Sequence, residues 1–219
     1  NNNILSLFLD RDNNLWLGLD NGIDFIAYNN AVKHIYPDPM NEGIGYSSML
    51  YNGRLYIGTS TGLYSVQAQD VKDLSTIRGK FTPVPGMRAP AWGLFLMNGH
   101  LLLAHHEGAY LISDGSVKPI NNDAGYFSFQ PFHSVLPSSV VIGGNYNGLD
   151  FMEYNNGSFI SGGNIPGFKE GSRFFAVDND GIIWVSHPYK GIYRVEKENN
   201  QASTRLYTEK DGLPSTVKN

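Results

Sequence analysis

Short apolar segments alternate with short polar turns along the chain, and the first unit shows the pattern most fully. Its apolar segments, each expected to form a β-strand, lie at residues 4–10, 15–19, 23–28 and 31–36. The first segment is strongly apolar, as expected of a strand packed on both faces between neighbouring sheets. Asn21 and Gly22 separate the second segment from the third, because both tolerate the positive φ of a tight hairpin. The unit therefore predicts a four-stranded antiparallel sheet.

This unit occurs five times. Each copy has a turn, a short apolar strand and a second turn that ends in glycine, at Gly22, Gly62, Gly108, Gly148 and Gly191. Their intervals of about 40 to 46 residues match the period of a β-propeller blade. A four-stranded sheet is too small to bury both of its faces alone, whereas sheets stacked around an axis cover one another. The repeat predicts an all-β protein, a β-propeller segment of five four-stranded antiparallel blades.

The boundaries of the blades follow from the period. We expect the blades at residues 1–40, 41–86, 87–122, 123–168 and 169–209, with residues 210–219 starting a further blade. Because the chain opens on an inner strand and stops at the entry to another, we expect a fragment of a larger, seven-bladed type of propeller. Residues 71–78 could form one short helical turn, but no stretch has a capped, helical apolar period.

Composition agrees with a folded all-β domain. Apolar residues make up 41% of the chain and aromatic residues 13%, which argues against a disordered chain. The net charge is −4 and no basic stripe occurs, so we expect no nucleic-acid partner. The chain has no cysteine, which excludes disulfides, thiolate catalysis and Cys-ligated zinc. No apolar run is long enough for a membrane-spanning helix.

The second strand of each unit carries a large apolar residue at a roughly equivalent place. These residues are Trp16, Tyr56, Leu102, Val141 and Trp184. Aromatic side chains bury much surface and dominate cores, so we expect this set to pack between neighbouring blades.

The candidate ligand-binding residues lie at strand entries and in loops of one face. Variable loops on a repeated scaffold are where function concentrates, and aromatic and hydrogen-bonding groups gathered on one face suit a sugar. The alternative for each is an ordinary polar loop or a contact with a neighbouring domain. The residues expected to contact a ligand are Tyr46, Trp92, His105, His106, Tyr146, Arg173, His187 and Tyr189.

The sequence predicts no catalytic residue, no metal site and no cofactor. Adjacent residues of a strand point to opposite faces, so His105 and His106 cannot easily bind one ion. The turn aspartates, such as Asp10 and Asp178, recur where Asx-type hydrogen bonds form, and they lack the spacing of an EF-hand calcium loop. Neither a Gly-x-Ser-x-Gly elbow nor a phosphate-binding glycine loop occurs.

Three segments resemble the regulator-propeller repeat of bacterial two-component sensors. They are Leu-Asp-Arg-Asp-Asn-Asn-Leu-Trp-Leu-Gly at residues 9–18, Asp-Asn-Asp-Gly-Ile-Ile-Trp-Val-Ser at 178–186 and Asp-Gly-Leu-Pro-Ser at 211–215. The second unit departs from the pattern with Tyr56 in place of Trp, and the third has Ala104 in place of Gly.

This resemblance implies the periplasmic sensor region of a hybrid two-component histidine kinase and response regulator of the Bacteroides type. The resemblance implies that such a region responds to carbohydrate fragments. It also implies that this chain itself would have no kinase activity. The implied partners are an oligosaccharide ligand, and further blades and a β-sandwich of the parent chain. We also expect a homodimer, since an ectodomain without chemistry signals by changing the relation between two protomers.

The sequence leaves two other classes of function open. Propeller lyases resembling streptogramin lyase use a similar turn repeat with a histidine and a divalent metal, for which the candidates are His105, His106, His133 and His187. Such an enzyme would turn over its substrate and lose activity with a chelator. A structural interaction module would show neither small-ligand binding nor turnover.

Overall fold

The chain folds into consecutive antiparallel sheets. The computed structural model describes residues 3–26, 35–38, 43–68, 81–133 and 136–217. The first sheet contains, among these residues, β1 (Ile4–Leu9), β2 (Leu15–Leu19) and β3 (Gly22–Ile26). The second contains β4 (Gly45–Tyr51), β5 (Arg54–Thr59), β6 (Gly62–Gln67) and β7 (Thr82–Pro83).

The next three sheets are four-stranded. They contain β8 (Ala91–Met97), β9 (His100–His105), β10 (Gly108–Ser113) and β11 (Ser116–Asn121), then β12 (Tyr126–Pro131), β13 (Val140–Asn145), β14 (Gly148–Asn155) and β15 (Ser158–Asn164). The last contains β16 (Phe174–Val177), β17 (Ile183–His187), β18 (Gly191–Glu198) and β19 (Gln201–Tyr207), and a short 3₁₀ helix, η2 (Glu209–Asp211), follows it. The strands of each sheet pair in chain order, which confirms the predicted all-β propeller architecture. The expected strand at 31–36 falls largely outside the described residues, and the possible helical turn at 71–78 falls wholly outside them.

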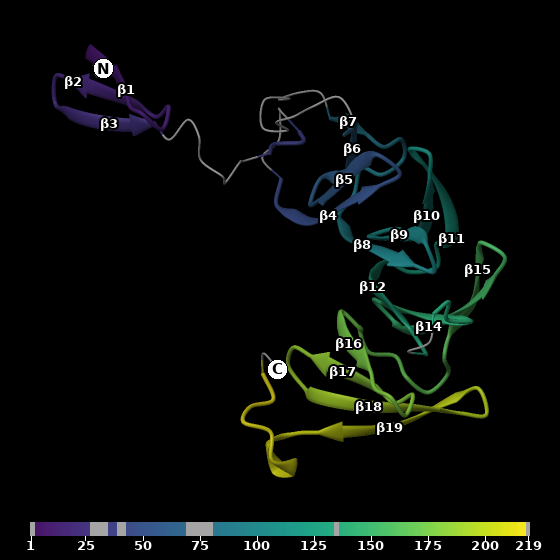
Figure 1. The fold of residues 1–219 in the computed structure, drawn as a ribbon. Coiled ribbons are helices and arrows are strands. Elements are labelled where there is room, and N and C mark those ends of the chain that lie inside the picture. Colours follow the sequence, from purple (N-terminus) through teal and green to yellow (C-terminus); the bar gives the residue numbers. More distant parts are fainter. Residues whose placement is uncertain (1–2, 27–34, 39–42, 69–80, 134–135, 218–219) are drawn as a thin grey trace.

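Four of the sheets follow one another along an arc (Figure 1). Their first strands, β4, β8, β12 and β16, lie on the inner side of this arc and contact one another in succession. The sheet β1–β3 lies apart from them (Figure 1). The expectation that residues 4–10 pack between blades is therefore wrong for this structure. Because no sheet lies against it, Leu5 is 70% exposed and Phe8 66% exposed.

Apolar side chains on both faces of the strands form the core between neighbouring sheets. Successive side chains of a strand point to opposite faces. On β9, Leu101 and Leu103 join the cluster shared with the preceding sheet, whereas Leu102 and Ala104 join the cluster shared with the following one. Each middle sheet is thus buried on both faces, as stacked blades require.

The equivalent place on β13 belongs to Ile142, one residue after the predicted Val141. Ile142 packs toward the last sheet, whereas Val141 packs toward the preceding one. The reason is the length of the hairpin: His187 pairs with Gly191, four positions later, but Asn145 pairs with Gly148, three positions later. Trp184 therefore lies one residue farther from Gly191 than Ile142 lies from Gly148. Applying the spacing of the last blade to the fourth blade points to Val141 instead of Ile142.

The turn aspartates act as predicted, through Asx-type hydrogen bonds. One carboxylate oxygen of Asp178 accepts from the backbone N–H groups of Asp180 (3.0 Å) and Ile182 (2.9 Å), and the other accepts from Nε1 of Trp184 (2.9 Å). Asp10 binds Trp16 in the same way. The hydrogen bond from each indole is the largest cause that holds the pKa of its aspartate below the usual value.

A buried polar network ties the third sheet to the fourth. Asp150 is fully buried, and its Oδ2 accepts from the hydroxyls of Tyr126 and Ser161, each at 2.6 Å. Asn121, on the outer strand of the third sheet, donates its Nδ2 to the same oxygen at 3.4 Å. Burial, followed by the nearby Asp150, raises the pKa of Tyr126 far above the usual value of a phenol. The phenol therefore stays protonated and donates to the carboxylate.

Candidate ligand-binding site

The inner strands each carry a β-bulge close to their first residue. The pairing register shifts between Gly45 and Ser47 on β4, between Ala91 and Gly93 on β8, and between Tyr126 and Ser128 on β12. The residues inside these bulges are Tyr46, Trp92 and Phe127. On β16 the pairing begins at Phe174, so Arg173 occupies the corresponding place. Bulges commonly re-aim a side chain beside a functional site.

The bulge residues and one loop residue form a continuous row of rings, which we call the aromatic ladder: Tyr46, Trp92, Phe127 and Tyr146. The ring centroids lie 4.9 Å apart between Tyr46 and Trp92, 5.8 Å between Trp92 and Phe127, and 4.5 Å between Phe127 and Tyr146. These distances are those of favourable aromatic pairs. The ladder therefore joins four positions from three blades into one surface.

The hydroxyl of Tyr146 fixes the middle of the ladder. It accepts from Nε1 of Trp92 at 2.8 Å and lies 2.8 Å from Nδ1 of His106, to which it can donate when the proton of His106 is on Nε2. Burial raises the pKa of Tyr146, so the phenol remains protonated at neutral pH. The rings of Trp92 and Tyr146 are thus held by hydrogen bonds as well as by packing.

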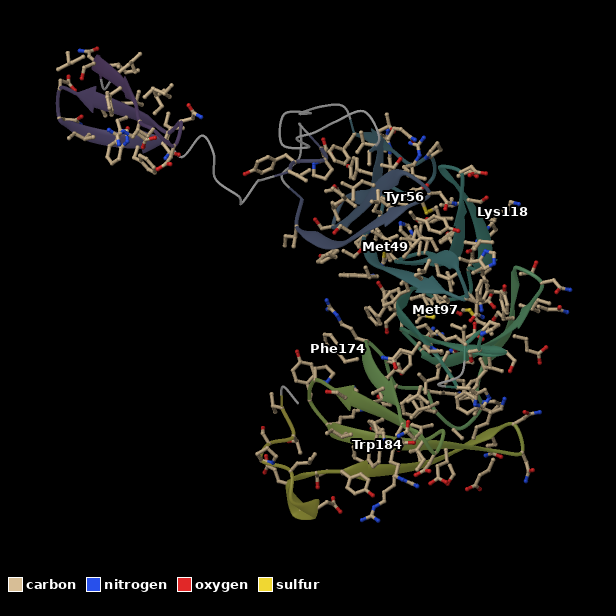
Figure 2. The ribbon with its side chains drawn as sticks, in the orientation of Figure 1. Met49, Tyr56, Met97, Lys118, Phe174 and Trp184 are labelled. Carbon is tan, nitrogen blue, oxygen red and sulfur yellow. The ribbon has the colours of Figure 1, made fainter. Side chains whose placement is uncertain are left out.

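Arg173 covers the two middle rings of the ladder. Its guanidinium carbon lies 5.2 Å from the ring centroid of Trp92, 5.7 Å from that of Phe127 and 5.5 Å from that of Phe174. Phe174 projects from β16 toward the inner side of the arc (Figure 2). The main chain is fixed as well, since the carbonyl of Arg173 accepts from Oγ of Ser128 at 3.3 Å. The result is a cation held over aromatic faces.

A pocket of ≈ 410 Å³ lies at this place. Tyr46, Trp92, Phe127, Arg173 and Phe174 line it, together with four further residues of β8, β12 and β16. Its volume is within the range of small-molecule sites, which are mostly apolar with a few polar groups.

The structure brings five of the eight predicted residues together: Tyr46, Trp92, His106, Tyr146 and Arg173. The prediction of the site omitted Phe127 and Phe174. The repeat carried a signal for Phe127, because it occupies the same bulge position as Tyr46 and Trp92.

The other three predicted residues lie away from the ladder. Nδ1 of His105 accepts from the backbone N–H of Glu107, and Nδ1 of His187 accepts from that of Tyr189, both at 3.2 Å. Thr59 and Asn145 accept in the same way at the equivalent turns, so both histidines close a β-hairpin. His105 is fully buried, and burial lowers its pKa. Tyr189 is 76% exposed and its ring packs beside that of His187.

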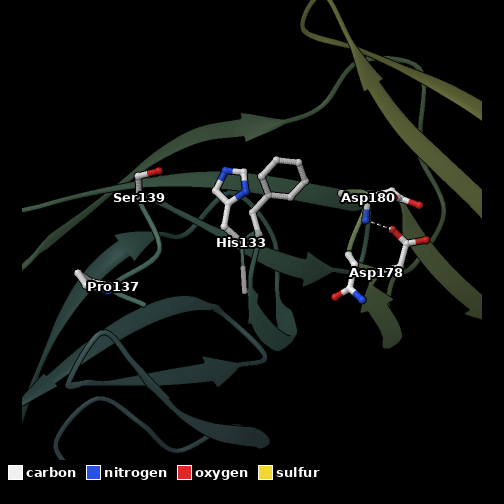
Figure 3. Close-up of a pocket in the computed structure, with 8 residues that line it drawn as sticks. His133, Pro137, Ser139, Asp178 and Asp180 are labelled. Atoms are coloured by element: carbon white, nitrogen blue, oxygen red, sulfur yellow. Dashed lines mark hydrogen bonds between the residues drawn. The ribbon is translucent and has the colours of Figure 1, made fainter. Parts of the chain in front are cut away.

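A second pocket, of ≈ 530 Å³, lies between the fourth and fifth sheets. Figure 3 shows His133, Pro137 and Ser139 on one side and Asp178 and Asp180 on the other. The carboxylate of Asp178 is occupied by its own turn and by Trp184. In the part of the chain that the structure describes, no three His, Asp or Glu side chains gather as a metal site. Nor does any described helix have the length and apolarity needed to span a membrane.

Comparison with known proteins agrees with the repeat. Residues 1–21 match the family model described as two component regulator propeller, which confirms the predicted resemblance. A search of curated protein sequences found no significant match.

The fold is similar to that of two extracellular domains of hybrid two-component systems from B. thetaiotaomicron. Their TM-scores are 0.65 and 0.56, at 18% and 12% sequence identity. Both comparisons cover 98% of this chain, but 30% and 35% of the other, so the chain spans about a third of the length of these ectodomains.

A catalytically inactive variant of virginiamycin B lyase from Staphylococcus aureus, solved with quinupristin, is also similar. Its TM-score is 0.51 at 13% identity, over 98% of this chain and 76% of the lyase. At such identities the similarity shows the fold alone. The chain is thus a β-propeller segment that carries a two-component regulator propeller repeat.

Proposed function

We propose that this chain is part of the ligand-sensing ectodomain of a hybrid two-component sensor, and that it binds carbohydrate fragments without turning them over. The observation that carries the proposal is the aromatic ladder beside an open pocket. Flat rings offer apolar faces for the C–H groups of a sugar, and Arg173, Tyr146 and His106 offer hydrogen-bonding groups around them.

The comparisons support the location of this function. The similar ectodomains are extracellular parts of hybrid two-component systems, and the matched repeat belongs to two-component regulators. We therefore place this chain outside the cytoplasmic membrane, in the periplasm. Since it spans about a third of those ectodomains, further blades and a β-sandwich of the parent chain would complete the sensor, which would signal as a homodimer through a histidine kinase.

A thermal-shift screen of this chain against a panel of oligosaccharides, with and without EDTA, tests the proposal. A ligand that binds only the native state raises the melting temperature by mass action. We expect one sugar class to raise it regardless of EDTA. Trp92→Ala should abolish the rise, whereas Tyr189→Ala, which removes an exposed aromatic residue outside the ladder, should preserve it. A rise that survives in Trp92→Ala, or that requires a metal, contradicts the proposal.

A further inference from the structure

Arg173 differs in its surroundings from three other cations of the described residues. Lys190 pairs with Glu170 at 2.7 Å, Arg205 pairs with Asp211 at 3.5 Å, and Arg194 pairs with Glu196. No carboxylate among the described residues pairs with Arg173, whose contacts are the rings of Trp92, Phe127 and Phe174. Arg173 is exposed, so its guanidinium is open to a ligand.

Charge in the pocket has one sign. Arg173 is the one charged side chain among the described residues that line it. Aromatic faces attract a guanidinium but do not neutralise it. A stacked guanidinium keeps its N–H groups at the edge of its plane, where they match two oxygens of a carboxylate or sulfate. The pocket is therefore complementary to an anion next to an apolar, ring-shaped surface.

The position of this charge is fixed by the fold. Ser128 of the fourth sheet donates to the carbonyl of Arg173 at 3.3 Å. The preceding residue, Ser172, is buried, and its backbone N–H donates to the carbonyl of Asn145 at 2.9 Å. The main chain that carries the cation is thus held at the junction of two blades, so less backbone freedom remains to be lost when a ligand binds.

From this arrangement we infer that the aromatic ladder recognises acidic carbohydrates, with Arg173 pairing with a carboxylate or sulfate of the sugar. The inference rests on the proposed function and names the substrate class of the same site. A neutral sugar can stack on the ladder, but it leaves the positive charge of Arg173 without a partner. An acidic group on the same sugar supplies that partner.

Calorimetric titration with matched pairs of sugars tests this inference. One pair is oligogalacturonides and their carboxyl-reduced form, and the other is sulfated carrageenan oligosaccharides and their desulfated form. The proteins are the unchanged chain, Arg173→Gln and Arg205→Gln. Arg205 also lies over a ring, that of Tyr207, and is 64% exposed, so its variant controls for the loss of one stacked cation.

We expect an acidic sugar to bind about tenfold to a hundredfold more tightly than its neutral form, as for a hydrogen bond to a charged group. Arg173→Gln should erase this preference while retaining binding of the neutral form, and Arg205→Gln should keep the preference. Added NaCl should weaken the preference, because the pair lies near the surface. The pair of sugars that shows the preference tells carboxylate from sulfate.

Two results would overturn the inference and leave the proposed function intact. One is binding of neutral and acidic forms with equal affinity, and the other is an acidic preference that persists in Arg173→Gln. Absence of binding by every sugar of the panel contradicts the proposed function itself, and this inference with it.

Discussion

Replacing Tyr126 with Phe tests the buried network that joins the third and fourth sheets. The ring of Tyr126 stacks beside Phe129 with centroids 5.7 Å apart, so Phe can keep the packing and lose only the hydroxyl. That hydroxyl donates to Oδ2 of Asp150 at 2.6 Å, and Asp150 is fully buried. Oδ1 of Asp150 already has no hydrogen-bond partner among the described residues. In the variant Oδ2 keeps its donors Ser161 and Asn121, but the carboxylate loses one of its two donors at 2.6 Å.

The expected cost follows from these contacts. A hydrogen bond to a charged group contributes about 1.5–3 kcal/mol. For a chain of this size, 1 kcal/mol corresponds to about 2–4 °C in melting temperature. Tyr126→Phe should thus lower the free energy of unfolding by about 2 kcal/mol and the melting temperature by about 4–8 °C, measured by urea titration and by circular dichroism.

Tyr110→Phe is the matched control. Tyr110 is 6% exposed, packs in the neighbouring interface, and its hydroxyl makes no hydrogen bond within the described part of the chain. The same chemical change should therefore cost less there. Equal losses in the two variants would show that the hydrogen bond from Tyr126 to Asp150 adds nothing to stability beyond what the hydroxyl of Tyr110 adds.

Two further changes test the turns of the repeat. The pKa of Asp178 is lowered by its hydrogen bonds in the fold, so its contribution to stability is present above the unfolded value near 3.8 and is lost as pH falls through the folded value. The stability gap between the unchanged chain and Asp178→Asn, followed by urea titration, should narrow from pH 7 to pH 3; a constant gap contradicts this cause. Gly148 has φ +149°, and a Cβ there would lie 2.8 Å from the carbonyl of Phe168. Gly148→Ala should cost more than about 1 kcal/mol in a denaturant titration. Gly45→Ala should cost less, because a Cβ at Gly45 would meet no atom of the described residues within 4 Å.

Much of the architecture could be predicted because the repeat is local. Turn glycines, turn aspartates and alternating strands lie close together in sequence, and the structure places them as hairpins. The network around Asp150 could not be predicted in this way. Tyr126, Ser161 and Asn121 approach it from separate strands, and no local pattern links them.

The candidate site was predictable only in part, for a related reason. Tyr46, Trp92 and Arg173 share a position at the entry of an inner strand, which the repeat reveals. His105 and His106 differ by one residue, yet the first ends a strand and is buried, whereas the second begins the loop and is exposed. The position at which the strand ends decides which histidine reaches the ladder, and the sequence alone does not give that position.

The central claim is that the aromatic ladder is where a sugar binds, and the indole N–H signals of the chain test it most directly. The chain has three tryptophans: Trp92 lies in the ladder, whereas Trp16 and Trp184 donate to turn aspartates. A ¹⁵N-labelled sample is titrated with the sugar class that raises the melting temperature, and its indole N–H signals are followed by NMR. The variant Trp92→Phe identifies the signal of Trp92, because that signal is missing from its spectrum. We predict that this signal shifts with saturation while the other two stay in place. Saturable binding that leaves the Trp92 signal unmoved would contradict it.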